Sequence, residues 1–369
     1  MEQKIFWVGF NKVKGIGPVR LKKLLNYFGN LERAWHASLI ELRSVGLGEK
    51  TLINLQNLRN NVDLEEEYEK IIKNSIKICT WEDEDYPLRL KEIQYPPPVL
   101  YMRGEIVPQD QWAVAIVGTR QKTSYGMQVT RELSSFLARN KITVVSGLAR
   151  GIDSIAHEAA LKANGRTIAV LGSGVDQIYP PEHRGLAMNV INNGALVSEY
   201  ALGTLPEGIN FPPRNRIISG LSLATIVIEA GVKSGALITA AFAADQGREV
   251  FAVPGAIYSP KSKGTNKLIA DGAHPLIRYD EILEVLNLEK VQEFHKAQRV
   301  LPSNEVELAL LKSISREPMH IDDIQNATGL PVEKVSAMLV MMELKGLVRQ
   351  IGNQTYLAIR EDEVDYGEE

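Results

Sequence analysis

The sequence predicts an α/β chain built around a doubly wound parallel sheet, with an all-helical segment before the sheet and a winged helix after it. Between residues 112 and 288, short apolar runs alternate with amphipathic stretches, which is the pattern of buried parallel strands joined by helical crossovers. Residues 1–75 show helical periodicity instead, and residues 304–369 follow the order helix, helix, turn, helix and hairpin. A chain of 369 residues exceeds what one core usually serves, so several domains are expected.

The N-terminal segment, residues 1–75, contains two similar turns that each open a helix. The turns are Val13–Pro18 and Val45–Gly48. Gly-hydrophobic-Gly turns are typical of helix-hairpin-helix (SAM-like) units, whose exposed backbone N–H groups can hold a phosphate. The alternative is a small helical bundle in which the glycines only supply tight turns. We expect helices at Arg20–Phe28, Glu49–Leu58 and Asp63–Asn74, and a secondary nucleic-acid contact at Lys14, Gly15, Gly17 and Arg20.

The central segment, residues 76–288, is predicted to be a Rossmann-like domain that opens with an edge hairpin around Ile76–Trp81 and Tyr95–Tyr101. The expected strands are Ala113–Val117, Ile142–Ser146, Thr167–Leu171, Ala195–Ser198, Ala224–Glu229, Glu249–Val253 and Leu276–Ile277. The expected helices are Ser124–Asn140, Gly151–Ala163, Pro181–Asn192, Arg214–Gly220, Gly235–Gly247 and Thr265–Asp271.

Residues that follow the predicted strands are candidates for a binding site, because the carboxyl ends of parallel strands meet at one edge of a sheet. Several of these turns are rich in Gly or Ser and open a helix, where N–H groups and the helix dipole favour an anion. Arginines there add mobile positive charge, and an arginine-lined rim suits a nucleic-acid strand better than a small carboxylate. The predicted site consists of Gly118, Thr119, Arg120, Ser146, Gly147, Arg150, Gly151, Asp153, Arg214, Asn215, Arg216, Lys233, Ser234 and Gly235.

Motifs for cofactor chemistry are missing from this edge, so we expect no cofactor. The first turn is Gly118-Thr119-Arg120 rather than Gly-x-Gly-x-x-Gly, and Ser146 ends the second strand where a ribose-binding acid is expected. No Walker A sequence is present. Asp153 and His157, four residues apart on one helix, form the best catalytic candidate, against a purely structural hydrogen-bonded role. Glu229 is either an acid or a cap of the next turn, and no catalytic residue is predicted.

Composition places the chain in a reducing compartment. Cys79 is the single cysteine, which excludes an intrachain disulfide, and no Cys/His group has zinc spacing, so we predict no metal site. The N-terminal apolar run is too short for a signal peptide or membrane span, and a cytoplasmic protein is expected.

A polar linker, residues 289–303, precedes the predicted winged helix, residues 304–369. Its helices are expected at Asn304–Ser315, Asp322–Thr328 and Val332–Lys345, with a hairpin at Gly346–Ala358 and its tip at Gly352-Asn353. This segment holds 6 basic and 13 acidic residues, which opposes the approach of phosphate. We therefore predict that it contacts protein or has a regulatory role.

An ordered series of motifs in the central segment resembles the DprA/Smf family of DNA-processing proteins. The series comprises Gly118-Thr119-Arg120, Ser146–Asp153 with His157, Phe211–Gly220, Glu229-Ala230 with Ser234–Ala240, Ala252–Gly255, and Gly264–Ile269 with Gly272-Ala273. It covers residues 80–280, and both flanking segments suit the family's architecture. Pro213 and Pro181-Glu182 depart from it, since family members often carry basic or polar residues at these places.

The resemblance implies a non-catalytic protein that binds single-stranded DNA, forms a homodimer and loads RecA onto incoming DNA covered by single-strand-binding protein in natural transformation. It assigns phosphate contact to Arg120 and to Arg214–Arg216, the floor of the pocket to Ser146, Gly147 and 150–153, and its closing wall to Ser234 and Gly235. It also suggests dimer contacts at Thr265–Ala273 and Ile282–Leu288. The alternatives are a phosphoribohydrolase-type nucleotide-processing enzyme, whose Pro-Gly-Gly-x-Gly-Thr-x-x-Glu stretch is missing here, and a nucleotide sensor that feeds the winged helix.

Overall fold

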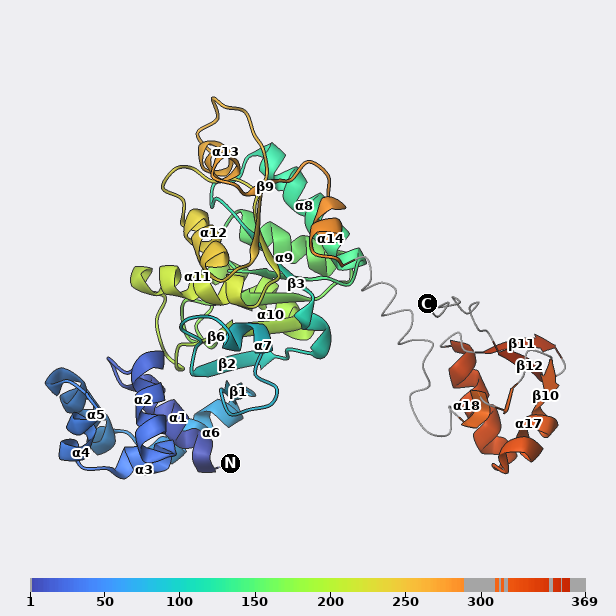
Figure 1. Ribbon diagram of the computed structural model, residues 1–369, viewed down its shortest axis with the longest axis horizontal. Helices are drawn as coiled ribbons and strands as arrows, with labels where there is room; N and C mark the ends of the chain where they lie inside the picture. The colour runs from blue at the N-terminus through green and yellow to red at the C-terminus, as the bar shows by residue number, and fades with distance from the viewer. Residues whose placement is uncertain are drawn as a thin grey trace, which may run out of the picture. The chain divides into compact units, whose positions relative to one another are not determined.

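The computed structural model describes residues 2–288, 309–311, 313–314, 318–344, 348–352 and 354–358. The chain forms two compact units, Met1–Ile282 and Leu283–Glu369, which we describe separately. The predicted linker 289–303, most of the predicted helix Asn304–Ser315 and Asn353 at the predicted hairpin tip lie outside the described residues. Figure 1 shows the elements of both units.

The N-terminal part of the first unit is helical, as predicted. Gly15 and Gly46 have positive φ values of 103° and 95°, a backbone conformation that favours glycine, and Gly17 and Gly48 are the N-caps of the two helices that follow the turns. The helices are α1 (Glu2–Lys12), α2 (Pro18–Phe28), α3 (Leu31–His36), α4 (Leu39–Ser44), α5 (Glu49–Asn61) and α6 (Leu64–Lys73).

The described residues of the first unit form a nine-stranded sheet in the order β1-β2-β6-β5-β4-β3-β7-β8-β9. The strands from β3 to β9 run parallel, while β1 and β2 form the predicted antiparallel hairpin and β2 pairs antiparallel with β6. The strands are β1 (Lys77–Thr80), β2 (Val99–Gly104), β3 (Ala113–Val117), β4 (Thr143–Ser146), β5 (Thr167–Val170), β6 (Gly194–Ser198), β7 (Ala224–Val227), β8 (Glu249–Ala252) and β9 (His274–Pro275).

Helices lie on both faces of this sheet, which makes it doubly wound. The chain steps outward from β3 to β6 and then returns to β7 on the other side of β3, so the strand order reverses between β3 and β7. Helices α8 and α9 pack together, as do α11 and α12. The helices are α7 (Leu88–Lys91), α8 (Ser124–Arg139), α9 (Ile152–Lys162), α10 (Arg184–Asn192), α11 (Phe211–Gly220), α12 (Gly235–Asp245), α13 (Lys263–Ala270) and α14 (Glu281–Val285), with short 3-10 helices η1 (Pro108–Gln111), η2 (Pro181–His183) and η3 (Gly208–Asn210).

Two predicted boundaries in this unit are wrong for identifiable reasons. Helix α11 begins at Phe211 rather than Arg214, because proline is well suited to the first turn of a helix, where no N–H donor is needed. Strand β9 lies at His274–Pro275 rather than Leu276–Ile277. The apolar pair predicted a strand buried on both faces, but only Leu276 is buried and Ile277 is 74% exposed.

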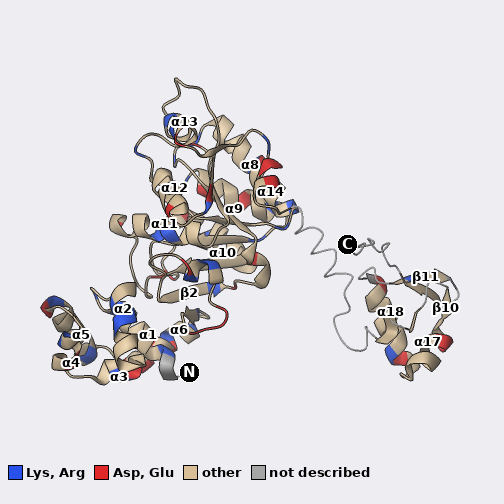
Figure 2. Cartoon of the chain, viewed as in Figure 1, with Lys and Arg blue, Asp and Glu red and all other residues tan. Residues whose placement is uncertain are grey.

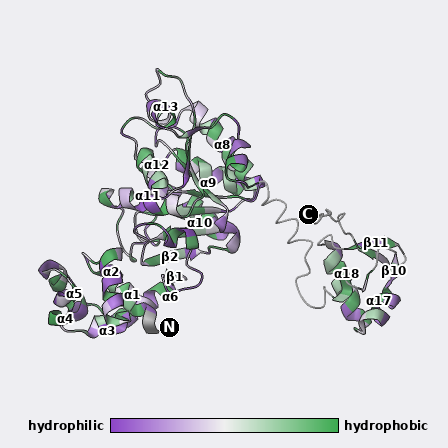
Figure 3. Ribbon diagram, viewed as in Figure 1, coloured by the Kyte–Doolittle hydropathy of each residue, from purple (hydrophilic) through white to green (hydrophobic). Residues whose placement is uncertain are grey.

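The hairpin of β1 and β2 contributes side chains to two cores. Ile78, Val99 and Tyr101 pack into the core of the N-terminal helices. Their strand neighbours, including Cys79 and Leu100, pack into the core under the sheet instead, because successive side chains of a strand point to opposite faces. Hydrophobic residues accordingly recur along both the helices and the strands of this unit (Figure 3). The apolar core of the helical segment therefore extends beyond residue 75.

The described part of the second unit has the predicted winged-helix arrangement. Its three strands pair in the order β10-β12-β11, and α17 packs on α18. Gly329 ends α17 with a φ of 65°, in the left-handed conformation expected of a glycine at a helix end. The elements are β10 (Met319–His320), α17 (Ile321–Thr328), α18 (Val332–Leu344), β11 (Val348–Gly352) and β12 (Thr355–Ala358).

Candidate nucleic-acid interface

An open cleft of about 810 Å³ lies where the strand order reverses, at the carboxyl ends of β3 and β7. Its walls come from the loops after β3, β4, β5, β6 and β7 and from the helices α11 and α12. This is the place where doubly wound sheets bind ligands. Of the fourteen residues predicted as the main site, nine line the cleft, namely Gly118, Thr119, Arg120, Asp153, Arg214, Asn215, Lys233, Ser234 and Gly235.

The loop that carries Arg120 is held in place by its neighbours. The Thr119 N–H donates to the Glu229 carbonyl oxygen at 2.8 Å, and the Thr119 carbonyl accepts from the Ile152 N–H at 3.2 Å. The Glu229 carboxylate, which is 3% exposed, accepts from the Thr123 N–H at 3.0 Å and from the Thr123 hydroxyl. Glu229 therefore fixes the loop on both sides of Arg120; its carboxylate binds the loop after β3 rather than capping the turn that follows its own strand.

Arg214 does not supply the mobile charge that the sequence predicted. Its side chain is buried, and its Nη1 donates to the Gly147 carbonyl at 2.9 Å and also to the Val170 carbonyl. Burial lowers the pKa of Arg214 to about 10. The earlier start of α11 explains the error, because it places this residue inside the helix and against the sheet.

Arg216 and Arg150 are also engaged elsewhere. Arg216 is 9% exposed and makes a two-pronged ion pair with Glu199, at 2.8 and 2.6 Å, so the prediction of mobile charge is wrong here too. Arg150 is exposed but pairs with Glu182 at 2.6 Å. Neither residue lines the cleft. Among the described residues, the exposed cations on the cleft wall are Arg120 and Lys233.

The remaining predicted residues shape the floor and walls. The Ser146 hydroxyl donates to the Ile116 carbonyl at 2.6 Å, and a side chain at Gly147 would meet the Arg214 guanidinium. Gly151 has a φ of 87° and packs against the Thr119 carbonyl. Asn215 donates to the Gly235 carbonyl at 3.3 Å, and Ser234 caps α12.

Asp153 and His157 each form hydrogen bonds within the protein and do not form a catalytic pair at the cleft. The Asp153 carboxylate accepts from the Gly147 N–H at 3.1 Å and the Ala149 N–H at 3.4 Å, and burial raises its pKa. His157 is fully buried, with its Nδ1 2.6 Å from the Thr167 hydroxyl, and burial lowers its pKa to about 3. His157 does not line the cleft.

The cleft has an aromatic wall that the sequence-based prediction of the site did not include. Phe211 and Tyr179 line the cleft with their ring centroids 5.9 Å apart. The guanidinium carbons of Arg120 and Arg214 each lie 5.8 Å from the centroid of the Phe211 ring. Flat aromatic surfaces bind nucleobases by stacking. An aromatic side chain just before the Pro-Pro-Arg segment is the sequence signal that could have identified this wall.

The predicted secondary site in the N-terminal helices is a compact turn. Arg20 donates to the Gly15 carbonyl, and its Nη1 lies 3.4 Å from the Thr51 hydroxyl. The Lys14 carbonyl accepts from Asn54 at 2.8 Å. Lys14 and Arg20 remain exposed, and Gly17 opens α2. Figure 2 shows basic residues on α2 and also at α11 and α13.

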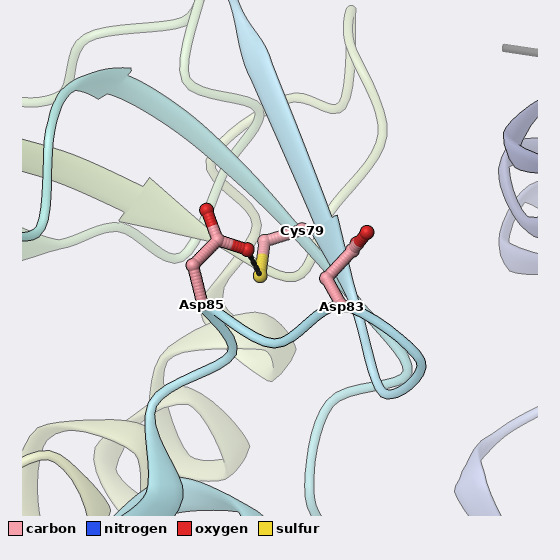
Figure 4. Close-up of side chains that lie close together, drawn as sticks. All are labelled: Cys79, Asp83 and Asp85. Atoms are coloured by element: carbon pink, nitrogen blue, oxygen red, sulfur yellow. Dashed lines mark hydrogen bonds between the residues drawn. The ribbon is translucent and has the colours of Figure 1, made fainter.

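Cys79, Asp83 and Asp85 lie close together near the hairpin of β1 and β2 (Figure 4). The buried Cys79 thiol donates to Asp85, and burial raises the pKa of Cys79 to about 12. Asp83 pairs with Lys4 at 2.7 Å, and Asp85 pairs with Lys77. Because the thiol is held protonated and both carboxylates are paired with lysines, we assign this cluster a structural role. In the part of the chain that the structure describes, no helix has the length and apolar character needed to cross a membrane.

The fold and the site define an α/β protein of three parts: a helical segment, a Rossmann-like sheet with a cleft that exposes Arg120 and Lys233, and a winged helix. Two family models match, DNA recombination-mediator protein A over residues 77–287 and the DprA winged helix domain over 295–354. The chain belongs to the DNA recombination-mediator protein A, or DprA/Smf, family.

Relatives of known name support this assignment along most of the chain. Protein Smf of Synechocystis is 37% identical, covering 96% of this chain and 98% of the relative. DNA processing protein DprA of Bacillus subtilis is 45% identical over 59% of this chain and 73% of its own. The solved structure of DprA from Streptococcus pneumoniae superposes with a TM-score of 0.67 at 32% identity, over 76% of this chain and 97% of that one. A solved structure of DNA processing protein A from Helicobacter pylori, which describes its single-stranded DNA binding mode, superposes with a TM-score of 0.52 at 32% identity. The match covers 58% of this chain and 97% of that one.

Proposed function

We propose that this chain binds single-stranded DNA in the cleft between the carboxyl ends of β3 and β7. The observation that carries the proposal is the joint presence, in one open cleft, of two exposed cations and an aromatic wall. Arg120 and Lys233 bind phosphates, and the Gly235 N–H in the first turn of α12 adds a backbone donor. Phe211 receives a base by stacking. The DNA-binding mode described for the Helicobacter pylori relative supports this choice of ligand.

In this proposal the protein is a recombination mediator that acts in the cytoplasm. It forms a homodimer, through the region of Thr265–Ala273 and Ile282–Leu288, and loads RecA onto a strand covered by single-strand-binding protein. The name of the matching family, a recombination mediator, supports this role. The winged helix contacts protein or regulates the sheet domain. Its described surface helix α18 carries Glu333, Lys334 and Glu343, a mixture of charges that does not favour phosphate.

The proposed role involves no catalysis. The three candidate acids and bases weighed from the sequence, Glu229, Asp153 and His157, are engaged in hydrogen bonds within the protein. Glu229 accepts from Thr123, Asp153 accepts from Gly147 and Ala149, and His157 contacts Thr167 inside the protein. Such contacts position Arg120 and the neighbouring helix starts for binding.

The test is a titration of oligothymidine with the full chain and with Arg120→Ala. Loss of one charged hydrogen bond, about 1.5–3 kcal/mol, should weaken binding roughly 10- to 150-fold. The slope of log affinity against log salt should fall by about 0.7, the contribution of one phosphate contact on a single strand. The matched control is Arg139→Ala, because Arg139 is exposed at the end of α8 that leads to the amino end of β4. Equal affinity of wild type and Arg120→Ala would exclude the proposed site.

A further inference from the structure

The loop between β8 and α13 presents two exposed apolar side chains at its tip. Tyr258 is 88% exposed and Ile257 is 72% exposed. The loop lies beside α13 at the top of the first unit in Figure 1. Single exposed apolar residues are ordinary, but an aromatic ring and an aliphatic side chain adjacent in one loop need a further explanation.

Hydrogen bonds at both ends hold this loop in one conformation. Asn266 binds the Gly255 backbone twice, accepting from its N–H at 3.1 Å and donating to its carbonyl at 2.9 Å. At the other end, the Lys261 carbonyl accepts from the Ala230 N–H at 2.7 Å. A turn closes the tip, where the Ser259 N–H donates to the Ala256 carbonyl at 2.9 Å. The tip is therefore preorganised, which reduces the entropy lost when a partner binds.

The loop continues the wall of the cleft. It follows β8, which pairs with β7, so its first residues stand at the same edge of the sheet, about 5 Å from the end of β7. The Pro254 carbonyl accepts from the Tyr125 hydroxyl at 3.1 Å, and Tyr125 lies in the first turn of α8, just after the Arg120 loop. Ala230, which binds Lys261, directly precedes the cleft residue Gly231.

The charge of the loop favours a phosphate-bearing partner. From Val253 to Ala270 the chain contains three lysines, Lys261, Lys263 and Lys267, and no acidic residue. Lys267 pairs with Asp271 at 2.8 Å, and the exposed Lys263 lies at the start of α13. An exposed aromatic ring among lysines, next to a basic cleft, combines stacking with backbone attraction.

We infer that the Pro254–Ser262 loop is a second base-stacking platform, on which Tyr258 receives a nucleobase of the strand that leaves the cleft past Lys233. This inference rests on the proposed function and names a further part of the same binding track. The strand enters at the aromatic wall of Phe211, crosses the carboxyl ends of β3 and β7, and continues along the loop after β8. Lys261 and Lys263 neutralise phosphates on either side of the stacked base.

The test compares oligothymidine binding by the full-length wild type, Tyr258→Ala and Tyr258→Trp. Stacking of one base contributes enough that Tyr258→Ala should bind roughly 5- to 150-fold more weakly, while Tyr258→Trp, which keeps a flat ring, should bind within about threefold of the wild type. The control is Tyr95→Ala, since Tyr95 is 45% exposed and lies before β2, in the hairpin beyond β6, and it should bind as the wild type does. Sedimentation at the same protein concentrations should give one mass for all four proteins.

Three results would overturn the inference. Unchanged affinity of Tyr258→Ala would show that no base stacks there, and equal losses in Tyr258→Ala and Tyr258→Trp would exclude stacking as the cause. A loss accompanied by a smaller sedimenting mass would assign the loop to a contact between two copies of the chain. If Tyr258→Ala is unaffected but Arg120→Ala is weakened, the proposed function stands and only this inference fails. A wild type that binds no oligothymidine would refute the proposed function itself.

Discussion

Replacement of Glu229 by glutamine separates a structural role of this carboxylate from a catalytic one. In the wild type its two oxygens accept from the N–H and the hydroxyl of Thr123, and the group is 3% exposed. Glutamine offers one oxygen and one NH2 group, so the carboxylate's two charged acceptors are replaced by one neutral acceptor for the two half-buried donors of Thr123. A hydrogen bond to a charged group contributes about 1.5–3 kcal/mol. Since about 1 kcal/mol shifts Tm by roughly 2–4 °C for a domain of this size, Glu229→Gln should lower Tm by about 3–12 °C.

The same substitution should weaken oligothymidine binding, because the Arg120 loop must then be ordered when the strand binds. Ordering one backbone residue costs about 1–2 kcal/mol, which corresponds to a roughly 5- to 30-fold loss of affinity. Calorimetric unfolding and the oligothymidine titration measure the two effects, with Glu158→Gln, an exposed glutamate on α9, as the control. An unchanged Tm would refute the argument that Glu229 holds the loop. Release of free base from a nucleoside monophosphate by the wild type, abolished in Glu229→Gln, would favour the phosphoribohydrolase alternative.

Two further predictions concern stability. Arg216→Ala leaves the Glu199 side chain, which is only 15% exposed, without its partner and should lower the free energy of unfolding by about 3 kcal/mol, as measured in urea. The comparison is the exposed pair of Lys70 with Glu66, because Lys70→Ala should change the free energy of unfolding far less. Equal losses would contradict the burial argument. Burial lowers the pKa of His157 to about 3, whereas an unfolded histidine titrates near 6.5. The unfolded chain therefore binds the proton more readily, so this contribution to stability is complete above pH 6.5 and is lost as the pH falls towards 3. Between pH 7 and pH 4.5 the wild type should lose roughly 2–3 kcal/mol more than His157→Gln, and parallel pH profiles would disprove it.

The parallel sheet was predictable from the sequence because its strands are buried on both faces. Ala113–Val117 is buried at every position and matches β3 at both ends, and the neighbouring strands deviate by one or two residues. Where only one side of a segment is buried, the predicted strand position was wrong, as at β9, where Ile277 is exposed. The start of α11 was missed because Pro212 and Pro213 can either precede a helix or occupy its first turn, and the sequence alone does not distinguish these cases.

The place of the site was predictable, but the state of its charges was not. The rule that loops at strand ends converge identified Arg120 and Lys233, which are exposed in the cleft. Arg214 and Arg216 look the same in the sequence, yet one is buried against the Gly147 carbonyl and the other is paired with Glu199 across the fold. Which arginine is engaged depends on carbonyl and carboxylate groups that the fold brings close from other elements, so only the folded structure reveals it. The aromatic wall was not predicted because the site was inferred from residues that bind phosphate, which are cations and backbone N–H groups rather than aromatic rings.

The two-sided packing of the β1–β2 hairpin has a consequence for how this protein can be divided. Tyr101 is fully buried and donates through its hydroxyl to Asn11 of α1 at 3.1 Å, and Val99 lies in the same apolar cluster. A version of the chain that starts at residue 76 would expose this apolar face of the hairpin to water, and we expect it to self-associate. Cutting after the hairpin would instead uncover the edge of β6. The N-terminal helices and the sheet therefore need each other to fold. A minimal DNA-binding fragment should be sought by removing the C-terminal unit.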